Sequence, residues 1–291
     1  MIGKPAPRES RHAPGSRTAL RRQPPVLLVI VVAVLALLAG LAANRWLRPR
    51  LLSEDDGTGM AVKDLVGPLL TMTVLLLSFV LVTANGSYGK AEVASRGEAR
   101  ALDQLVETAE YAPDAQRARI QAAAVCYARA VRVQEWPAMA DGKGSPAPSV
   151  WSTDFRATFE DLAGQPVFGM LVAADNKRSD EREERLTQAT ASIPSAILWF
   201  LLATLVITVV ALGICLPRRN NRGQLITLVV ITALLTTALC IIRDVDRPFG
   251  GIIQVEPTAI TEAERQATRD FTANHPAAEL PCDDEGDRRA A

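Results

Sequence analysis

Side chains suited to acid–base or metal chemistry are sparse in this sequence. Only two histidines occur, His12 and His275, and both lie in polar stretches near the ends of the chain. The four cysteines, at positions 126, 215, 240 and 282, include no pair at CxxC spacing. Cys215 and Cys240 lie in apolar runs and are interpreted as small membrane-embedded residues. We therefore expect neither a metal site nor a cofactor.

Catalytic motifs are absent as well. The sequence contains no HExxH, no glycine-rich phosphate loop and no Gly-x-Ser-x-Gly elbow. The run KRSDEREER at 177–185 is rich in both signs of charge, which is typical of a solvated helix rather than of a paired-carboxylate site. Lys and Arg number 32 and Asp and Glu also number 32, which argues against a nucleic-acid-binding surface. The sequence predicts a protein that is not an enzyme.

Charge is instead segregated along the chain, and four long stretches are almost wholly apolar. A helix needs about 20 apolar residues to cross the bilayer core. The stretches that meet this length are 26–43, 65–84, 193–216 and 225–242. The first has an apolar core too long for a signal peptide and is interpreted as a retained anchor. The spacer between the last two allows only a tight antiparallel hairpin, so the sequence predicts four membrane-spanning helices in a 2+2 arrangement.

These stretches divide the chain into five parts. A disordered basic tail (1–24) precedes the first transmembrane pair (25–84), and a helical region (85–193) separates it from the second pair and its post-helix turn (194–260). A polar tail, partly disordered from Glu279 onward, occupies 261–291. Lys and Arg favour the cytoplasmic side of short flanks. Their distribution favours a cytoplasmic N-terminus, middle region and C-terminus in the cell membrane, although the basic second hairpin argues the other way.

The middle region has the periodicity of helices and no alternating strand pattern. Leu102, Leu105, Val106 and Ala109 recur at helical spacing, and Asp114 can begin a second helix that runs to about Trp136. Trp136 itself could dock at the headgroup boundary. A third helix is marked by Trp151, Phe155, Phe159 and Leu162. The sequence therefore predicts an all-α fold.

Leu75, Phe79 and Thr83 form an i, i+4, i+8 stripe in the second apolar stretch. Facing a pore axis, they would make a narrow apolar neck that ends in a ring of hydroxyls. The alternative is ordinary helix packing, in which the hydroxyls bond to carbonyls of their own helix. The four stretches carry no ionisable residue, which weighs against ion-coupled transport but not against a passive pore.

A second distinctive element follows the fourth stretch. Asp246, Arg247, Pro248, Phe249 and Gly250 are predicted to form a structural turn, because proline stops the helix and glycine frees the backbone. The alternative is a plain helix-terminating turn with no further role.

The order of these elements resembles the bestrophin-like family of bacterial membrane proteins, which is related to the bestrophin anion channels. The resemblance covers about 65–260 and is carried by four segments: LSFVLVTANGSY, YARAVRVQEWPAM, SIP and DVDRPFGG. It implies a homo-oligomer, with the pentamer as the family's form, whose second span lines a pore with an apolar neck. It also implies cytoplasmic termini and middle helices.

Leu75 and Phe79 match the neck positions of the family, whereas Thr83 replaces a third bulky apolar residue. The neck is therefore expected to be shorter or wetter. The family's acidic calcium-binding run is missing after Pro248-Phe249-Gly250, where Glu256 is the only nearby acid, so calcium gating is not expected. The leading hypothesis is a passive anion channel. The alternative is a non-conducting membrane scaffold whose middle helices bind a cytoplasmic partner.

Overall fold

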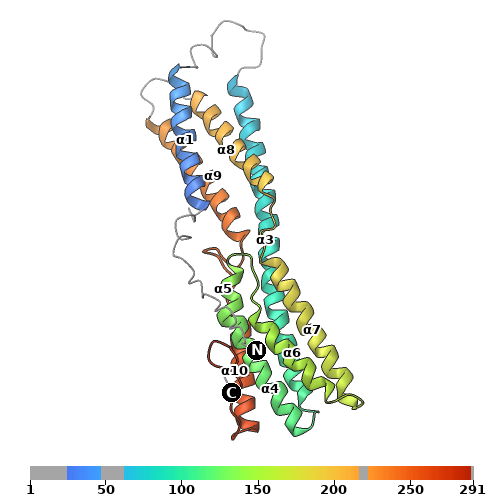
Figure 1. Cartoon of the computed structure of the whole chain (residues 1–291). Helices are drawn as coiled ribbons and strands as arrows, with labels where there is room; N and C mark the ends of the chain where they lie inside the picture. Colours follow the sequence, from blue (N-terminus) through green and yellow to red (C-terminus); the bar gives the residue numbers. More distant parts are fainter. Residues whose placement is uncertain (1–24, 47–61, 216–221, 290–291) are drawn as a thin grey trace, which may run out of the picture.

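The computed structural model describes residues 25–46, 62–215 and 222–289, and this part of the chain is all-α. The expected disordered tail, 1–24, lies outside the described residues. Figure 1 shows one elongated molecule with a membrane half at one end and a helical body at the other. The long helix α3 belongs to both.

The membrane half consists of α1 (Pro25–Trp46), the first part of α3 (Val62–Ala109), α8 (Ser195–Cys215) and α9 (Arg222–Val245). All four helices are long and apolar enough to cross a membrane, which confirms the four predicted spans. Small residues allow α1 and α8 to approach closely: a Cβ added to Gly213 would lie 2.7 Å from the Gly40 carbonyl carbon.

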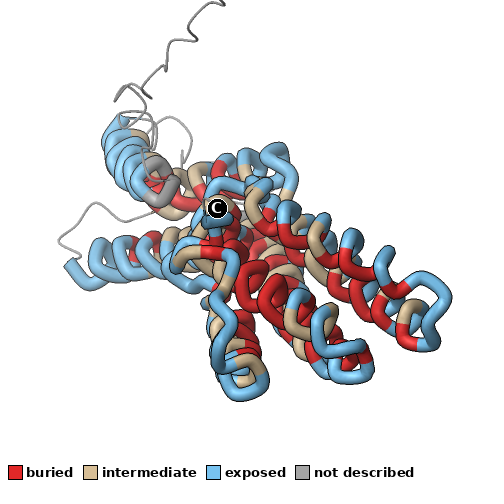
Figure 2. The backbone as a smooth tube through the Cα atoms, turned by 60° about the horizontal axis from the view of Figure 1, so that its bottom comes forward, coloured by how far each residue is buried: buried red, intermediate tan, exposed pale blue. Residues whose placement is uncertain are grey.

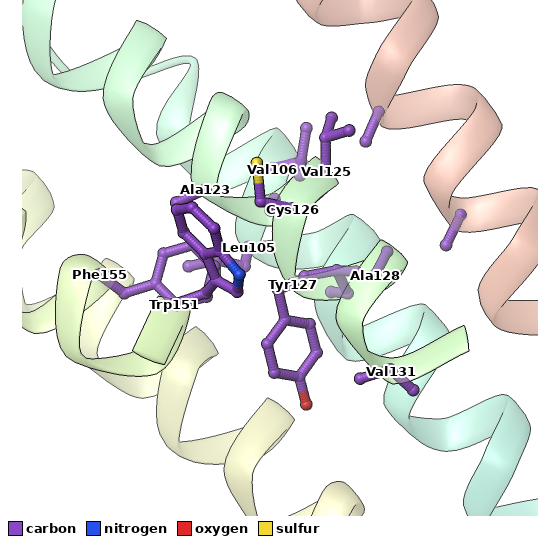
Figure 3. Packing of buried hydrophobic residues seen from close by; sticks show 14 of the residues in the cluster. Leu105, Val106, Ala123, Val125, Cys126, Tyr127, Ala128, Val131, Trp151 and Phe155 are labelled. Carbon is purple, nitrogen blue, oxygen red and sulfur yellow. The ribbon is translucent and has the colours of Figure 1, made fainter. Parts of the chain in front are cut away.

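The helical body contains the rest of the described chain. Its elements are α4 (Asp114–Ala130), the π-helix η2 (Val131–Glu135), α5 (Trp136–Met139), α6 (Ala147–Glu160), α7 (Pro166–Gln188) and α10 (Thr258–Asn274). The second half of α3 packs along α7. The predicted aromatic stripe is confirmed: Trp151 and Phe155 are fully buried and pack beside Tyr127 in the core (Figure 3).

The helix α3 is longer than expected. The sequence predicts a span that ends at residue 84 and, in the region 85–193, helical spacing at Leu102 to Ala109, but one helix continues from Val62 to Ala109. Gly86 and Gly89 lie in the join, but glycine costs a helix only about 1 kcal/mol per residue, so the helix can continue through them. The boundary between membrane and body therefore falls inside a continuous helix.

Residues 261–289 pack on the helical body, whereas the sequence predicts partial disorder from Glu279 onward. Helix α10 packs on α3 and α4, and the chain then returns over α4, where Cys282 forms a disulfide with Cys126. Local composition could not reveal this, because the bond joins residues 156 positions apart. Figure 2 shows the buried residues concentrated where the body helices face one another.

Candidate functional site

The predicted stripe on α3 is exposed in the membrane half. The side chain of Leu75 is 53% exposed and that of Phe79 is 71% exposed, and Thr83 lies one turn further along. An open hollow of about 690 Å³ lies over this face. Its lining residues all belong to α3: Gly67, Pro68, Thr71, Met72, Leu75, Leu76 and Phe79. A hollow with a single helix as its wall is an unpartnered surface, and it becomes enclosed only when something else covers it.

The hydroxyls of this span are bonded to their own helix. Thr83 donates to the Phe79 carbonyl at 3.0 Å, and Ser78 donates to the Val74 carbonyl at 2.8 Å. This is the local bonding expected under the helix-packing alternative. The Thr83 hydroxyl oxygen keeps acceptor capacity, but its hydrogen is already used.

One hydroxyl of α3 also reaches a second helix. Thr73 is buried and lies 2.7 Å from the hydroxyl of Thr208 on α8. A polar pair of this kind fixes how α8 sits against α3. It lies on the opposite side of α3 from the exposed stripe, so the stripe is held in place without being covered.

The exposed face continues toward the body with basic residues. Lys90 lies three turns after Phe79 and is exposed, and Arg100 is exposed further along. Arg96 is also exposed and pairs with Glu92 at 2.5 Å. The apolar face of the membrane half thus passes into a charged one at the body, where the exposed bases Lys90 and Arg100 lie among acids such as Glu92 and Glu107.

The predicted turn after α9 connects three parts of the molecule. The carboxylate of Asp246 is buried and accepts hydrogen bonds from the backbone N–H groups of Ser192 and Ile193, both at 3.0 Å. It thereby caps the chain just before α8, where an anion is favoured by the helix dipole. Two residues earlier, Asp244 accepts from the backbone N–H groups of Ile252 and Ile253.

The remaining turn residues pack against the body. The Pro248 carbonyl accepts from the Val255 N–H at 2.7 Å, and the buried Phe249 ring meets Trp136 edge-on at 5.4 Å. A Cβ on Gly250 would lie 2.7 Å from the Ala140 carbonyl oxygen, so only glycine fits this approach without a shift. Arg247 is exposed. The turn is thus a packed joint between α9, α8 and α5.

Trp136 does not dock at a headgroup boundary as the sequence suggested. It is buried, and its indole N–H donates to the Val255 carbonyl at 3.2 Å. The indole N–H finds its partner inside the protein, which explains how this amphipathic side chain is satisfied away from lipid.

Sequence reasoning missed a buried ion network in the body. Arg185 on α7 pairs with Glu98 on α3 and, at 2.5 Å, with Glu135 on η2. Arg182 also pairs with Glu135, at 2.6 Å, and Tyr127 donates to Glu98 at 2.5 Å. The network ties α3, α4, η2 and α7 together.

Burial and charge act in opposition within this network. Burial disfavours the ionised form of Glu135, but the hydrogen bonds and positive charges of Arg182 and Arg185 outweigh it and lower the pKa of the carboxyl. Burial, aided by the charge of Glu98, raises the pKa of the Tyr127 phenol, so it remains a hydrogen-bond donor.

The run 177–185 is therefore solvated on one face only. Arg178 and Arg185 are fully buried, whereas Asp180, Glu183 and Glu184 are exposed, as expected. The spacing of the two buried arginines gave only a weak indication of their burial: they are seven residues apart and therefore share a helix face. Nothing in the local composition distinguished them from their solvated neighbours.

Comparisons with protein families and with solved structures agree with each other. Residues 30–260 match the Bestrophin-like domain family. Among solved structures, a single-residue variant of a bacterial bestrophin homolog from Klebsiella pneumoniae is similar, with a TM-score of 0.63 and 14% identity over 82% of this chain and 99% of that one. A second structure of that homolog has a TM-score of 0.56 and 15% identity over 86% and 100%. No match is found among curated proteins.

Proposed function

Because the chain belongs to the bestrophin-like family, we propose that it is one subunit of an oligomeric channel that conducts anions passively across the cell membrane. The observation that carries the proposal is the exposed apolar face of α3 at Leu75 and Phe79. The other described helices pack elsewhere on α3 and leave this face open.

Several copies around one axis would enclose the face. The Leu75 side chains of all subunits would then form one ring around the axis, and the Phe79 side chains another. Together they would make a narrow apolar neck, which resists wetting and can gate ion flow. The two residues are one helical turn apart, so they would form two stacked layers. With Thr83 next in the stripe, the neck is short and ends at a more polar ring.

The charge along the same helix supports an anion as the permeant ion. Lys90 and Arg100 are exposed on the continuation of α3. Repeated around an axis, they would raise the local concentration of anions at the entrance of the neck. Among the described residues, the stretch of α3 from Leu75 to Thr83 contains no carboxylate that would favour a cation instead.

We place the helical body and both termini on the cytoplasmic side. The tail 1–24 carries six Lys and Arg against one acid, the asymmetry expected of a cytoplasmic flank. Two spans separate this tail from the body, which puts the two on the same side of the membrane. The post-helix turn follows the fourth span and lies on that side as well.

The proposal is tested by size and by flux. We expect the protein in mild detergent to have the mass of a multimer, the pentamer being the family's form. We also expect liposomes containing it to release chloride. Phe79→Ala should change the flux several-fold, because it removes the bulkiest ring from the neck. Phe200→Ala on α8 is the matched control, since Phe200 is also an exposed aromatic of a span.

A protein that stays monomeric and conducts nothing would sink the channel proposal. In that case, capture of a specific partner through residues 85–193 would support the scaffold alternative. Equal flux changes in Phe79→Ala and Phe200→Ala would also count against the neck.

A further inference from the structure

The last described residues, 279–289, form a strap that lies over α4, η2 and α6 (hereafter the C-terminal strap). Arg129 on α4 donates to the Asp283 carbonyl at 3.0 Å, and Gln134 on η2 donates to the Glu285 carbonyl at 3.0 Å. Trp151 on α6 donates to the Gly286 carbonyl at 2.9 Å. Gly286 has a φ of +83° and meets the Ala130 backbone so closely that no side chain fits. The strap therefore has a defined seat.

A disulfide fastens the strap to this seat. It joins Cys126 of α4 to Cys282, and both residues are fully buried. The ion pair of Arg288 with Asp154 is partly exposed, and exposed pairs contribute little. Leu280 is only partly buried. The disulfide thus adds a covalent link to the hydrogen bonds that Arg129, Gln134 and Trp151 donate to the strap.

The strap lies beyond the part of the chain that the family shares. The matched domain ends at residue 260, and the strap begins after α10. Helix α10 has its own apolar anchor, since Ile260, Ala263, Ala267 and Phe271 are all buried. Loss of the disulfide would therefore free the strap without undocking α10.

We propose that Cys126 and Cys282 form a reversible thiol–disulfide latch that fastens the C-terminal strap when oxidised and releases it when reduced. This inference rests on the cytoplasmic side given to the body in the proposed function, not on ion conduction. Disulfides in a reducing cytoplasm are mostly transient and redox-responsive, whereas permanent ones belong to oxidising compartments.

The chemistry is ordinary thiol–disulfide exchange with a dithiol reductant. A thiolate of the dithiol attacks one sulfur, the protein S–S bond breaks, and a mixed disulfide forms. The second thiol of the dithiol then displaces the protein sulfur. Overall, two electrons and two protons pass from the dithiol to the protein. The protein disulfide becomes two thiols, and the dithiol is oxidised to a cyclic disulfide.

A hollow beside the latch gives a small reagent a way in. It measures about 370 Å³ and lies between α4, α6, α10 and the strap. Ala122 in its wall is one turn before Cys126, and Pro281 in its wall is next to Cys282. The sulfurs themselves remain covered, so we expect exchange to follow a local opening of the strap.

Release would uncover one face of α4 and η2. Arg129, Ala130 and Gln134 would lose their strap partners. Gln134 adjoins Glu135 of the buried ion network. The latch therefore acts next to the residues that connect η2 to α7 and α3.

The first test measures hydrogen exchange of the full-length protein in lipid nanodiscs, before and after dithiothreitol. We expect amide exchange in 279–289 to accelerate at least tenfold on reduction and to return after reoxidation with diamide. Exchange in α10 should not change. Cys282→Ser should behave as the reduced protein throughout, and Cys240→Ser, a change at a free cysteine, should behave as the parent.

Unchanged protection of 279–289, with both thiols shown by alkylation to be reduced, would overturn the latch. So would unfolding of α10 together with the strap, or a disulfide that dithiothreitol cannot reduce in the folded protein.

The second test measures the thiol state in intact cells by acid quenching and alkylation. We expect a mostly reduced pair that becomes oxidised after diamide and recovers when diamide is removed. A pair that is fully oxidised under both conditions would mean a permanent disulfide and would overturn the latch. Neither test measures flux, so a failure of conduction and a failure of the latch are distinguishable.

Discussion

The two halves of α3 have opposite surfaces. In the membrane half, Phe79 is 71% exposed, whereas in the body Leu105 is fully buried on the same helix. The body also buries charge, at Glu98 and Arg185, while the membrane half confines its charged residues to the ends of its spans. Water drives apolar groups inward in the body, but lipid exerts no such drive on the membrane half. An apolar face can therefore stay open there at little cost.

The contacts that hold each half differ accordingly. The membrane half relies on close approach of small residues and on the hydroxyl pair of Thr73 and Thr208. The body relies on an apolar core, an ion network and a disulfide. Substitutions of similar chemistry should therefore have different effects in the two halves.

The largest expected effect is in the body. Arg185→Met should destabilise it by about 3–5 kcal/mol, because Glu98 and Glu135 would remain buried without their main counter-charge. Denaturant unfolding followed by the fluorescence of Trp136 and Trp151 would measure this. Arg100→Met, at an exposed site, should change stability by less than about 0.5 kcal/mol. Equal losses would contradict a special role for the network.

In the membrane half, Gly213→Val should lower the free energy of unfolding by about 1–3 kcal/mol, because the added atoms would push α8 away from Gly40. Thermal unfolding of the purified protein in detergent would measure the loss. Gly223→Val is the control, since nothing lies close to its Cβ position. A control as unstable as Gly213→Val would show that β-branching, not close packing, is responsible.

At the joint between the halves, Asp246→Ala should lower the free energy of unfolding by about 0.5–2 kcal/mol, because it removes the cap before α8. Asp246→Asn keeps an acceptor oxygen and should recover part of that loss. Hydrogen exchange of the Ser192 and Ile193 amides is the direct measure. Amides that stay protected in Asp246→Ala would refute the capping role.

The smallest expected effect is a dependence on pH. The pKa of Glu135 is lower in the folded protein than its ordinary value of 4.5. Its ionisation therefore contributes stability above pH 4.5, and this contribution is lost as the pH falls through the folded-state value. The denaturation midpoint of the body should decline with acidification over that range. Glu135→Gln should show a shallower decline, and an identical slope would exclude Glu135 as the cause.

The sequence was sufficient for features that repeat locally. Apolar length identified the four spans, and spacing identified the Trp151–Phe155 stripe. Spacing also grouped Leu75 and Phe79 on one face of α3, and their role as a pore lining stays a prediction. It was not sufficient for contacts between distant positions. Cys126 and Cys282 are 156 residues apart, and Arg185 lies in a charged run that resembles a solvated face. Only the packing of α3 against α7 reveals that this arginine is buried.

If the α3 face lines a pore between subunits, a cysteine on that face should be open to small water-soluble reagents. In a Cys215→Ser, Cys240→Ser background, a water-soluble methanethiosulfonate would be added to liposomes that contain Phe79→Cys or Phe200→Cys. We expect the reagent to block chloride flux through Phe79→Cys and to leave flux through Phe200→Cys unchanged. Flux that is equally insensitive in both variants, despite complete labelling of Phe79→Cys, would contradict this expectation.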